Sequence, residues 1–309
     1  MVFTLSASMA AAVAVIDTAA AGDPISYQEL LSIPQPAAVE PIAYGTVPLQ
    51  FGELRLPQTD AVTAPYPVVL LIHGGCWLAE YDMGHVRPLA QALADAGYAS
   101  WTLEYRRVGD AGGGWPGTFH DVAQGADFLH QLAQQYPLDL SRTVAVGHSA
   151  GGQLALWLAS RHGYDAEHGF YRADAIELKG IVGLAAAADM DLLAQGRECD
   201  DAARRVLEGT PEQVESRYAA VSPARRVPLG VPQILIDGVE DHMWGPISAS
   251  YYRSAQAAGD QVQRIVVEET AHFDLVAPQA PVWPHLLAAI ETLMHGQHGQ
   301  ETQPKAVLR

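Results

Sequence analysis

The chain has 309 residues, an apolar fraction of 49% and a formal net charge of −17 at neutral pH. This charge argues against nucleic acid or an anionic membrane surface as a partner, because phosphate groups would be repelled. No run of eighteen or more apolar residues predicts a membrane span. The length and apolar content predict one large α/β domain or two small ones, with ample material for an extended core.

The N-terminus has a mixed signature. Residues 9–16 form a small apolar run, and residues 19–21 offer an A-x-A cleavage pattern. Both fit a secretory signal, but no Lys or Arg precedes Arg55, so the basic region of a signal is missing. Residues 1–22 are therefore expected to be either an export signal or a disordered lead-in, and both a cytoplasmic and an exported location stay open. The polar tail 296–309 is expected to be frayed.

Strands and helices are expected to alternate along the rest of the chain. Short strand-like pieces between prolines at 43–56 suit an antiparallel edge hairpin. Continuous apolar, β-branched runs predict buried parallel strands, and apolar residues at helical spacing predict helices. The strands are expected at 67–72, 98–104, 143–147, 180–185, 233–237 and 262–267, and the helices at 85–96, 118–134, 153–160, 246–258 and 281–294. The alternation predicts a mostly parallel central sheet with helices on both faces.

One stretch breaks this alternation. Residues 186–226 are charged and helix-prone, and they lie between two predicted strands. Ligands bind at the carboxyl ends of the strands in open α/β sheets, and we expect this insertion to lie over those ends. The sequence thus predicts a single domain over 23–295 with a lid-like or pocket-forming insertion.

The sequence contains two cysteines, Cys76 and Cys199. Neither has a C-x-x-C or a Cys/His spacing that is typical of metal ligands, so no disulfide framework and no zinc site are predicted. Two free thiols are the expected state, and one disulfide between them is the alternative.

The motif around Ser149 is the strongest functional signal. Residues 147–151 read G-x-S-x-G, after an apolar strand and before a helical run. Strand, sharp turn and helix are the context in which this pattern forms a nucleophile elbow. The serine is expected in a strained backbone conformation, and Gly147 and Gly151 are expected to allow close packing of neighbouring segments.

A serine hydroxyl needs a base and a group that orients the base. Asp241 follows the strand 233–237 and a glycine turn, and it is the predicted acid. Asp237 still lies at the strand, Glu240 is the nearest rival, and a helix-capping role for Asp241 is the alternative interpretation.

His272 follows the last strand and comes after the acid in the chain, which predicts the base. Among the other histidines, His148 lies inside the elbow and His120 in a helix, and both are expected to be structural. His73 begins the segment after strand 67–72, where it is expected to orient a loop.

The remaining requirement is a set of donors for an oxyanion. The strand ending at Ile72 runs into His73, Gly74, Gly75 and Cys76. Two glycines allow backbone N–H groups to turn toward one point, and Ala150 at the helix N-terminus offers a further donor. The alternative is a plain turn between a strand and a helix.

These motifs together resemble the α/β-hydrolase superfamily. The segments 73–77 and 147–152 with Asp241 and His272 are similar to the esterase/lipase branch with an HGG-type oxyanion loop, which includes carboxylesterase-like, kynurenine-formamidase-like and feruloyl- or acetyl-xylan-esterase-like members. Glu104–Arg107, Gly113–Pro116 and Asp121–Val122 also resemble a segment of that branch, where Arg106 and Asp121 would form a structural pair beneath the elbow. The resemblance covers roughly residues 45–295. It departs from the branch at Cys76 and in the acidic insertion 186–226.

The resemblance implies a serine hydrolase that cleaves carboxylic esters of small or medium acyl or aryl groups. Ser149, Asp241 and His272 would be catalytic, the N–H groups of the 74–76 loop and of Ala150 would hold the oxyanion, and no metal or organic cofactor is implied. Arylformamide hydrolysis with the same residues is the alternative reaction. A binding protein without catalytic activity and a peptidase module are the alternative classes. Several large side chains flank these motifs and predict an apolar pocket: Trp77, Leu78, Trp115, His242, Met243, Trp244 and Phe273.

Overall fold

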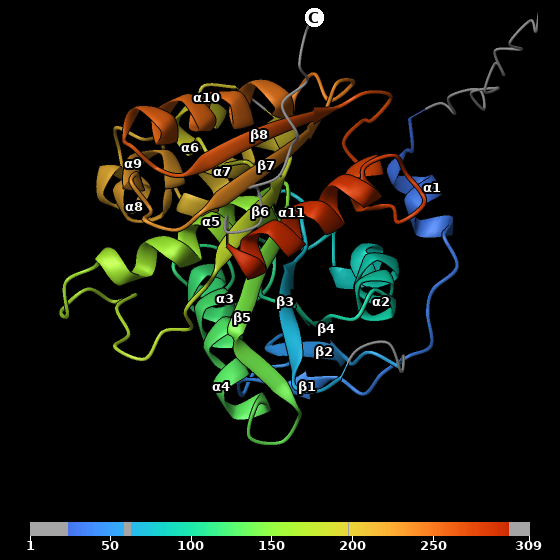
Figure 1. Ribbon diagram of the computed structural model, residues 1–309. Helices are drawn as coiled ribbons and strands as arrows, with labels where there is room; N and C mark the ends of the chain where they lie inside the picture. The colour runs from blue at the N-terminus through green and yellow to red at the C-terminus, as the bar shows by residue number, and fades with distance from the viewer. Residues whose placement is uncertain (1–23, 59–62, 197, 297–309) are drawn as a thin grey trace, which may run out of the picture.

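The computed structural model describes residues 24–58, 63–196 and 198–296. The predicted signal or lead-in at 1–22 and all but the first residue of the predicted tail 296–309 lie outside the described residues. The fold is built on one eight-stranded sheet with the order β1-β2-β4-β3-β5-β6-β7-β8 (Figure 1). The strands are β1 (Ile42–Ala43), β2 (Phe51–Arg55), β3 (Tyr66–Ile72), β4 (Ala99–Leu103), β5 (Leu138–His148), β6 (Gly180–Leu184), β7 (Gln233–Gly238) and β8 (Val262–Val267).

The sheet is mostly parallel, as predicted. β1 and β2 form the expected antiparallel hairpin at one edge, and β2 pairs antiparallel with β4. All pairings from β4 to β8 are parallel, with Ile72 of β3 beside Gly147 of β5. Consecutive parallel strands therefore end at one edge of the sheet, and the loops that carry the predicted site residues all leave from that edge.

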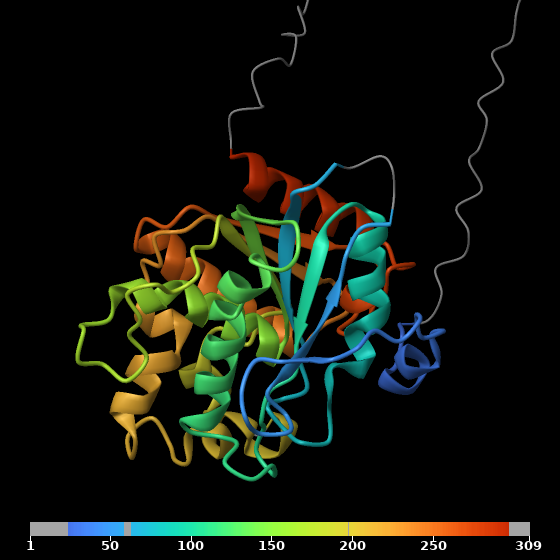
Figure 2. The same ribbon diagram turned by 90° about the horizontal axis from the view of Figure 1, so that it is seen from below.

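Helices cover both faces of the sheet. α2 (Arg87–Asp95) and α11 (Trp283–His295) lie on one side, and α3 (Gly117–Asp127), α5 (Ala150–Ser160) and α10 (Trp244–Ala257) lie on the other (Figure 2). Because both faces are covered, the central strands are largely apolar, and Val69, Leu70 and Val146 have no exposed surface. Within the described residues, no helix has the length and apolar character needed to cross a membrane.

Two predicted helices differ from expectation. The helix expected from residue 85 begins as a 3₁₀ turn, Met83–Val86, before α2. The single helix expected at 118–134 is divided into α3 and a short α4 (Leu129–Leu132). The Trp101 indole donates a hydrogen bond of 2.8 Å to the Gly125 carbonyl, the group that would accept the next helical bond. This contact comes from a neighbouring strand, which is why helical spacing alone did not reveal the break.

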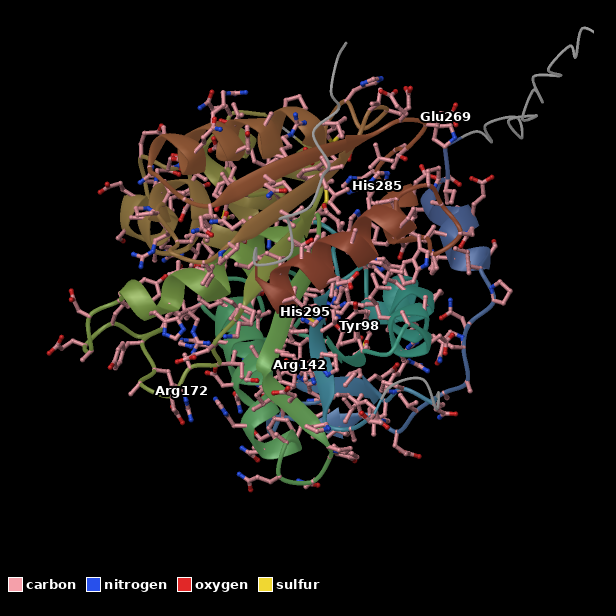
Figure 3. The ribbon with its side chains drawn as sticks, viewed as in Figure 1. Tyr98, Arg142, Arg172, Glu269, His285 and His295 are labelled. Atoms are coloured by element: carbon pink, nitrogen blue, oxygen red, sulfur yellow. A yellow bond between two sulfur atoms is a disulfide. The ribbon has the colours of Figure 1, made fainter. Side chains whose placement is uncertain are left out.

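Four helices occupy the 186–226 insertion: α6 (Met190–Leu193), α7 (Glu198–Leu207), α8 (Glu215–Val221) and α9 (Pro223–Arg226). Several contacts attach the insertion to the body, among them a bond of 2.7 Å from the Ser250 hydroxyl to the Asp189 carboxylate. The Gln153 amide on α5 donates a bond of 2.7 Å to the Val221 carbonyl. A disulfide joins Cys199 to Cys76, with their Cα atoms 6.0 Å apart, and is drawn as a yellow bond in Figure 3.

The disulfide corrects the expectation of two free thiols. The sequence separation of 123 residues gave no sign of the pairing. Cys199 and the two residues after it have φ between 51° and 59°, so regular helix in α7 begins only after them. The pairing arises because this irregular start of α7 folds back over the loop that follows β3.

The N-terminal and connecting segments complete the described fold. α1 (Tyr27–Ser32) precedes the sheet and lies at its margin, beside the loop that follows β8 (Figure 1). Two further 3₁₀ turns occur at Arg161–Gly163 and Asp274–Val276. Arg172 lies on the long connection before β6 and is labelled at the outer margin of the molecule in Figure 3, far from the carboxyl edge of the sheet.

Candidate active site

The turn between β5 and α5 has the geometry of an elbow. Ser149 adopts φ 55° and ψ −119°, a conformation that non-glycine residues rarely take. A Cβ at Gly147 would lie 2.1 Å from the Gly151 carbonyl oxygen, and a Cβ at Gly151 would lie 2.2 Å from the Ile72 carbonyl oxygen. Both glycines are therefore required by close approach of backbone to backbone, as the motif predicted. The Ser149 N–H donates a bond of 2.8 Å to the Leu184 carbonyl, which fixes the turn to β6.

The loops after β7 and β8 bring an acid and a histidine together. His272 Nδ1 lies 2.6 Å from Asp241 Oδ2, and the Asp241 side chain is only 3% exposed. The other oxygen of Asp241 accepts a bond of 3.1 Å from the Trp244 N–H. A carboxylate in this position fixes the tautomer of the ring, because it accepts the Nδ1 proton and leaves Nε2 free as an acceptor.

The two rival acids lie elsewhere. Glu240 is about half exposed, and its Oε2 lies 3.6 Å from His242 Nε2. Asp237 is fully buried at the end of β7, and it accepts a bond of 2.6 Å from Arg264. Burial raises the pKa of Asp237, and the Arg264 charge opposes that rise. The geometry thus singles out Asp241 as the partner of His272.

Three contacts hold the His272 loop. His148 Nε2 donates a bond of 2.9 Å to the His272 carbonyl, and Asp274 accepts a bond of 2.9 Å from the Ala271 N–H. The Trp244 indole stacks on the His272 ring, with 5.4 Å between centroids. Burial, followed by the neighbouring His272 and His85, holds the pKa of His148 well below its usual range. His148 is therefore neutral and has the structural role that was expected for it.

The loop after β3 has the backbone form expected for an oxyanion site. Gly75 and Cys76 have φ of 109° and 54°, which turns their N–H groups away from the strand direction. A Cβ at Gly74 would lie 3.1 Å from the Ser149 Cβ, so this loop runs directly beside the serine. Among the described residues, no acceptor is recorded for the N–H groups of Gly74, Gly75, Cys76 or Ala150. Ala150 is the first residue of α5, where such groups are free to bind an anion.

A buried charge cluster supports this loop from below. Glu104 Oε1 lies 3.1 Å from His73 Nε2 and 3.1 Å from Arg107 Nη1, and Glu104 Oε2 accepts a bond of 3.1 Å from the Met83 N–H. Burial would raise the pKa of Glu104, but His73 and Arg107 hold it below its usual range. The Tyr105 hydroxyl donates a bond of 2.8 Å to the His73 carbonyl. His73 thus has the loop-orienting contacts that the sequence predicted.

Three other residues that were expected to be structural can be placed. Arg106 binds Asp121 in a bidentate pair, with bonds of 2.6 and 2.7 Å. The Gln50 amide donates a further bond of 2.7 Å to the same carboxylate. The pair predicted for Arg106 and Asp121 is present, and it joins α3 to the segments after β1 and β4. His120 lies on α3, where burial lowers its pKa.

A pocket of about 290 Å³ brings the candidate residues together. Ser149, Asp241 and His272 line it with Gly75 and Cys76, whereas Gly74 and Ala150 lie outside the lining. Of the flanking side chains singled out in the sequence, Met243, Trp244 and Phe273 line the pocket. The other four do not: Trp77, Leu78, Trp115 and His242. Among the described residues, no hydrogen bond joins Ser149 Oγ to His272. Such bonds commonly tighten only when substrate binds.

Four further lining residues had no signal in the sequence: Tyr27, Tyr81, His85 and Cys199. Tyr27 precedes the whole sheet, and Cys199 comes from the insertion, so neither is adjacent to a motif. No group of three His, Cys, Asp or Glu side chains that could hold a metal ion occurs among the described residues.

Comparison with known proteins assigns the chain to a family. A family model described as BD-FAE matches residues 53–251, more than half of the chain. The chain belongs to the BD-FAE family. The BD-FAE match includes Ser149 and Asp241 and ends before His272, which therefore comes from a part of the chain that the model does not cover.

Solved structures share the fold of this BD-FAE member. It is similar to esterase B from Lactobacillus rhamnosis (HN001), with 21% identity and a TM-score of 0.71, over 83% of this chain and 85% of that chain. It is also similar to a bifunctional GH43-CE protein from Bacteroides eggerthii, with 22% identity and a TM-score of 0.66, over 82% of this chain and 37% of that chain. These likenesses confirm the predicted α/β-hydrolase fold.

One curated relative is similar in sequence. The chain is 35% identical over 144 residues to a non-reducing polyketide synthase from Aspergillus calidoustus. The match covers 41% of this chain and 6% of that protein, so the BD-FAE member spans only a small part of the relative's length. The bifunctional GH43-CE protein is likewise more than twice as long as the region it shares with this chain.

Proposed function

We propose that this protein is a serine hydrolase that cleaves carboxylic esters. The observation that carries the proposal is the 2.6 Å contact between His272 Nδ1 and Asp241, in the same pocket as an elbow serine with φ 55°. The contact leaves Nε2 of His272 free to act as a base, and the serine beside it is held at the mouth of a helix N-terminus. Membership of the BD-FAE family and the fold shared with esterases support the same reaction.

The reaction would proceed through an acyl-enzyme. His272 Nε2 takes the proton as Ser149 Oγ attacks the ester carbonyl, and Asp241 stabilises the imidazolium that forms. N–H groups of Gly75, Cys76 and Ala150 hold the oxyanion. Collapse breaks the bond to the leaving oxygen, which receives the proton from His272 as the alcohol departs. A water molecule then attacks the acyl group, His272 accepts its proton, and the carboxylic acid and free serine are regenerated.

The pocket favours substrates of small or medium size. Its volume of about 290 Å³ is at the lower end of ligand sites. Its wall includes apolar and aromatic side chains such as Met243, Trp244 and Phe273, so an acyl or aryl group would be bound by apolar contact. We further propose that the 186–226 insertion forms one wall, because Cys199 lines the pocket and is bonded to Cys76.

An arylformamidase is the second candidate. The same serine, histidine and aspartate would attack a formyl amide, and the aromatic lining at Trp244 and Phe273 suits an aryl group. The two reactions differ in the leaving group and not in the catalytic residues.

The test compares both reactions with one covalent probe. Purified protein is assayed with p-nitrophenyl butyrate and with N-formylkynurenine, before and after treatment with a serine-directed phosphonate whose site is mapped by mass spectrometry. We expect ester turnover to fall in proportion to the fraction of Ser149 that carries the phosphonate. Ser160→Ala, which removes another serine of α5, serves as the control variant. Faster formamide than ester turnover would select the second candidate. Ester turnover that survives complete labelling of Ser149 would overturn both.

A further inference from the structure

The N-terminal helix α1 reaches the candidate active site. Tyr27 lines the same pocket as Ser149, although it lies 122 residues before it in the chain. Its ring contacts three other pocket residues, with centroid distances of 5.1 Å to Tyr81, 5.4 Å to Phe273 and 5.9 Å to His85. These edge and tilted contacts are the arrangements that aromatic rings prefer. The four rings form one continuous aromatic wall.

α1 is stabilised by a cap at its N-terminal end and by its buried face. Ser26 and Glu29 form a capping box, in which Ser26 Oγ accepts a bond of 3.3 Å from the Glu29 N–H and the Glu29 carboxylate accepts a bond of 2.8 Å from the Ser26 N–H. Leu30 has no exposed surface and belongs to the main core, whereas Leu31 on the same helix is 43% exposed. The helix is therefore held against the body by Leu30, and Tyr27 keeps a fixed position.

The anchor of α1 is also connected to the histidine loop. The Asp274 carboxylate accepts a bond of 3.3 Å from the Ile25 N–H and a bond of 2.9 Å from the Ala271 N–H. One buried carboxylate thus joins the segment before α1 to the residue before His272. In Figure 3, Glu269 on the same loop is labelled on the side of the molecule where α1 lies.

The helix α1, which carries Tyr27, lies outside the part of the chain that the family model matches. The match begins at residue 53, and α1 ends at Ser32. The hydrogen bonds, the buried Leu30 and the aromatic contacts show that the segment nevertheless forms one side of the pocket. A pocket of about 290 Å³ has little spare room, so the side chain at position 27 limits which groups fit.

We propose that Tyr27 is a specificity-determining residue, and that α1 acts as a fixed wall that restricts the pocket to short acyl chains. The inference rests on the proposed ester hydrolysis at Ser149. Tyr27 touches neither His272 nor Asp241 through any recorded hydrogen bond, so it acts on the shape of the pocket and not on the proton transfers. A long acyl chain has to displace the Tyr27 ring from its contacts with Tyr81 and Phe273, and a short one does not.

The experiment compares kcat/KM for p-nitrophenyl acetate and p-nitrophenyl octanoate. In Tyr27→Ala we expect the octanoate-to-acetate ratio to rise about tenfold, which is the effect of about 1.4 kcal/mol on one transition state relative to the other. Tyr27→Phe should keep the wild-type ratio, because no hydrogen bond of the Tyr27 hydroxyl is recorded among the described residues. Leu31→Ala removes an exposed side chain from the same helix and should also keep the ratio.

Further variants and the phosphonate label separate the possible outcomes. Leu30→Ala undocks α1 and should raise the ratio as Tyr27→Ala does, and Tyr27→Leu provides the same test with a bulkier side chain if Tyr27→Ala does not fold. An unchanged ratio in a folded Tyr27→Ala or Tyr27→Leu protein whose Ser149 still takes the phosphonate overturns this inference alone. Wild-type protein without label on Ser149 and without ester turnover overturns the proposed function itself.

Discussion

The nucleophile edge of the sheet and the 186–226 insertion are held in place by opposite means. At the edge, backbone approaches backbone so closely that Gly147 and Gly151 have no room for a Cβ. In the insertion, short helices carry surface ion pairs such as Arg205 with Asp200, whose side chains are 40% and 85% exposed. Such pairs contribute little, typically below about 1 kcal/mol. The edge is determined by local sterics, whereas the insertion is held by side chains buried in the main core, such as Val206, Tyr218 and Val221, and by bonds to distant parts of the chain.

The largest expected effect lies at the edge. Ser149→Ala should lower kcat for p-nitrophenyl butyrate by at least about 10⁴-fold, because it removes the attacking oxygen. The free energy of unfolding should stay within about 1 kcal/mol of wild type, since alanine keeps the Cβ and the Ser149 side chain makes no recorded hydrogen bond in the described chain. Steady-state kinetics and urea denaturation measure the two quantities.

Asp241→Asn is the companion variant, with an expected loss of about 10⁴-fold through the wrong His272 tautomer. Glu240→Gln is its matched control, because Glu240 is adjacent in sequence but points toward solvent. A severe loss of activity in Glu240→Gln together with a mild loss in Asp241→Asn would show that Glu240, and not Asp241, is the acid of this site.

The next effect concerns the disulfide that joins the insertion to the loop after β3. Cys199→Ser should lower the free energy of unfolding by about 2–5 kcal/mol, the range observed when a native disulfide is removed. Urea denaturation with and without dithiothreitol provides an internal control: the reductant should destabilise wild type by the same amount and leave Cys199→Ser unchanged. Two titratable thiols in the unreduced, unfolded wild type would contradict the pairing.

The same substitution, glycine to alanine, made once in each region compares directly how well the two regions tolerate an added Cβ. Gly151→Ala puts a Cβ 2.2 Å from the Ile72 carbonyl oxygen, where only backbone movement relieves the overlap. We expect a loss of about 3 kcal/mol or more, or failure to fold. Gly209→Ala in the insertion meets the Val214 side chain at 3.0 Å, which a small rotation relieves, and it should cost below about 1 kcal/mol. Similar losses in the two variants would show that the edge is not sterically distinct.

The last effect appears only in acid. Burial, followed by the neighbouring His73, lowers the pKa of His85 from 6.5 to about 4. Between these pH values the unfolded chain binds the proton on His85 and the folded chain does not. The contribution of His85 to the free energy of unfolding is therefore fully present above pH 6.5 and is lost as the pH is lowered toward 4. His85 alone contributes a loss of about 3 kcal/mol at pH 4, and His148 adds to it in the same direction.

The measurement for this prediction is the free energy of unfolding across the pH range. His85→Gln should reduce its slope between pH 6.5 and 4, and His162→Gln, at an exposed position, should leave the slope unchanged. Equal slopes in wild type and His85→Gln would contradict the shifted pKa.

The contrast between local sterics at the edge of the sheet and long-range contacts in the insertion explains which features the sequence predicted. The strands, the elbow around Ser149 and the loop at Gly74 and Gly75 are determined by residues close together in the chain, so periodicity and motif spacing were sufficient. Asp241 and His272 were identifiable because parallel strands end at one edge of the sheet, which places the loops after them side by side. Their catalytic roles remain a prediction, as does the lid-like role of the insertion.

The features that were missed depend on contacts across the fold. The disulfide requires the start of α7 to fold back over the loop after β3, and nothing near Cys76 or Cys199 signals this. The break between α3 and α4 comes from the indole of Trp101 on a separate strand. Tyr27 reaches the pocket only because Leu30 docks α1 beside the histidine loop.

The disulfide also divides the candidate site topologically. It closes a covalent ring from Cys76 to Cys199 that contains Ser149, whereas Asp241 and His272 lie on the open C-terminal arm. A proteolytic cut in the exposed connection 165–167 would leave two fragments that migrate together until a reductant separates them. When the oxidised chain unfolds, the disulfide keeps Ser149 within a closed loop, and renewed activity requires this loop to refold and β7 and β8 to dock again beside it.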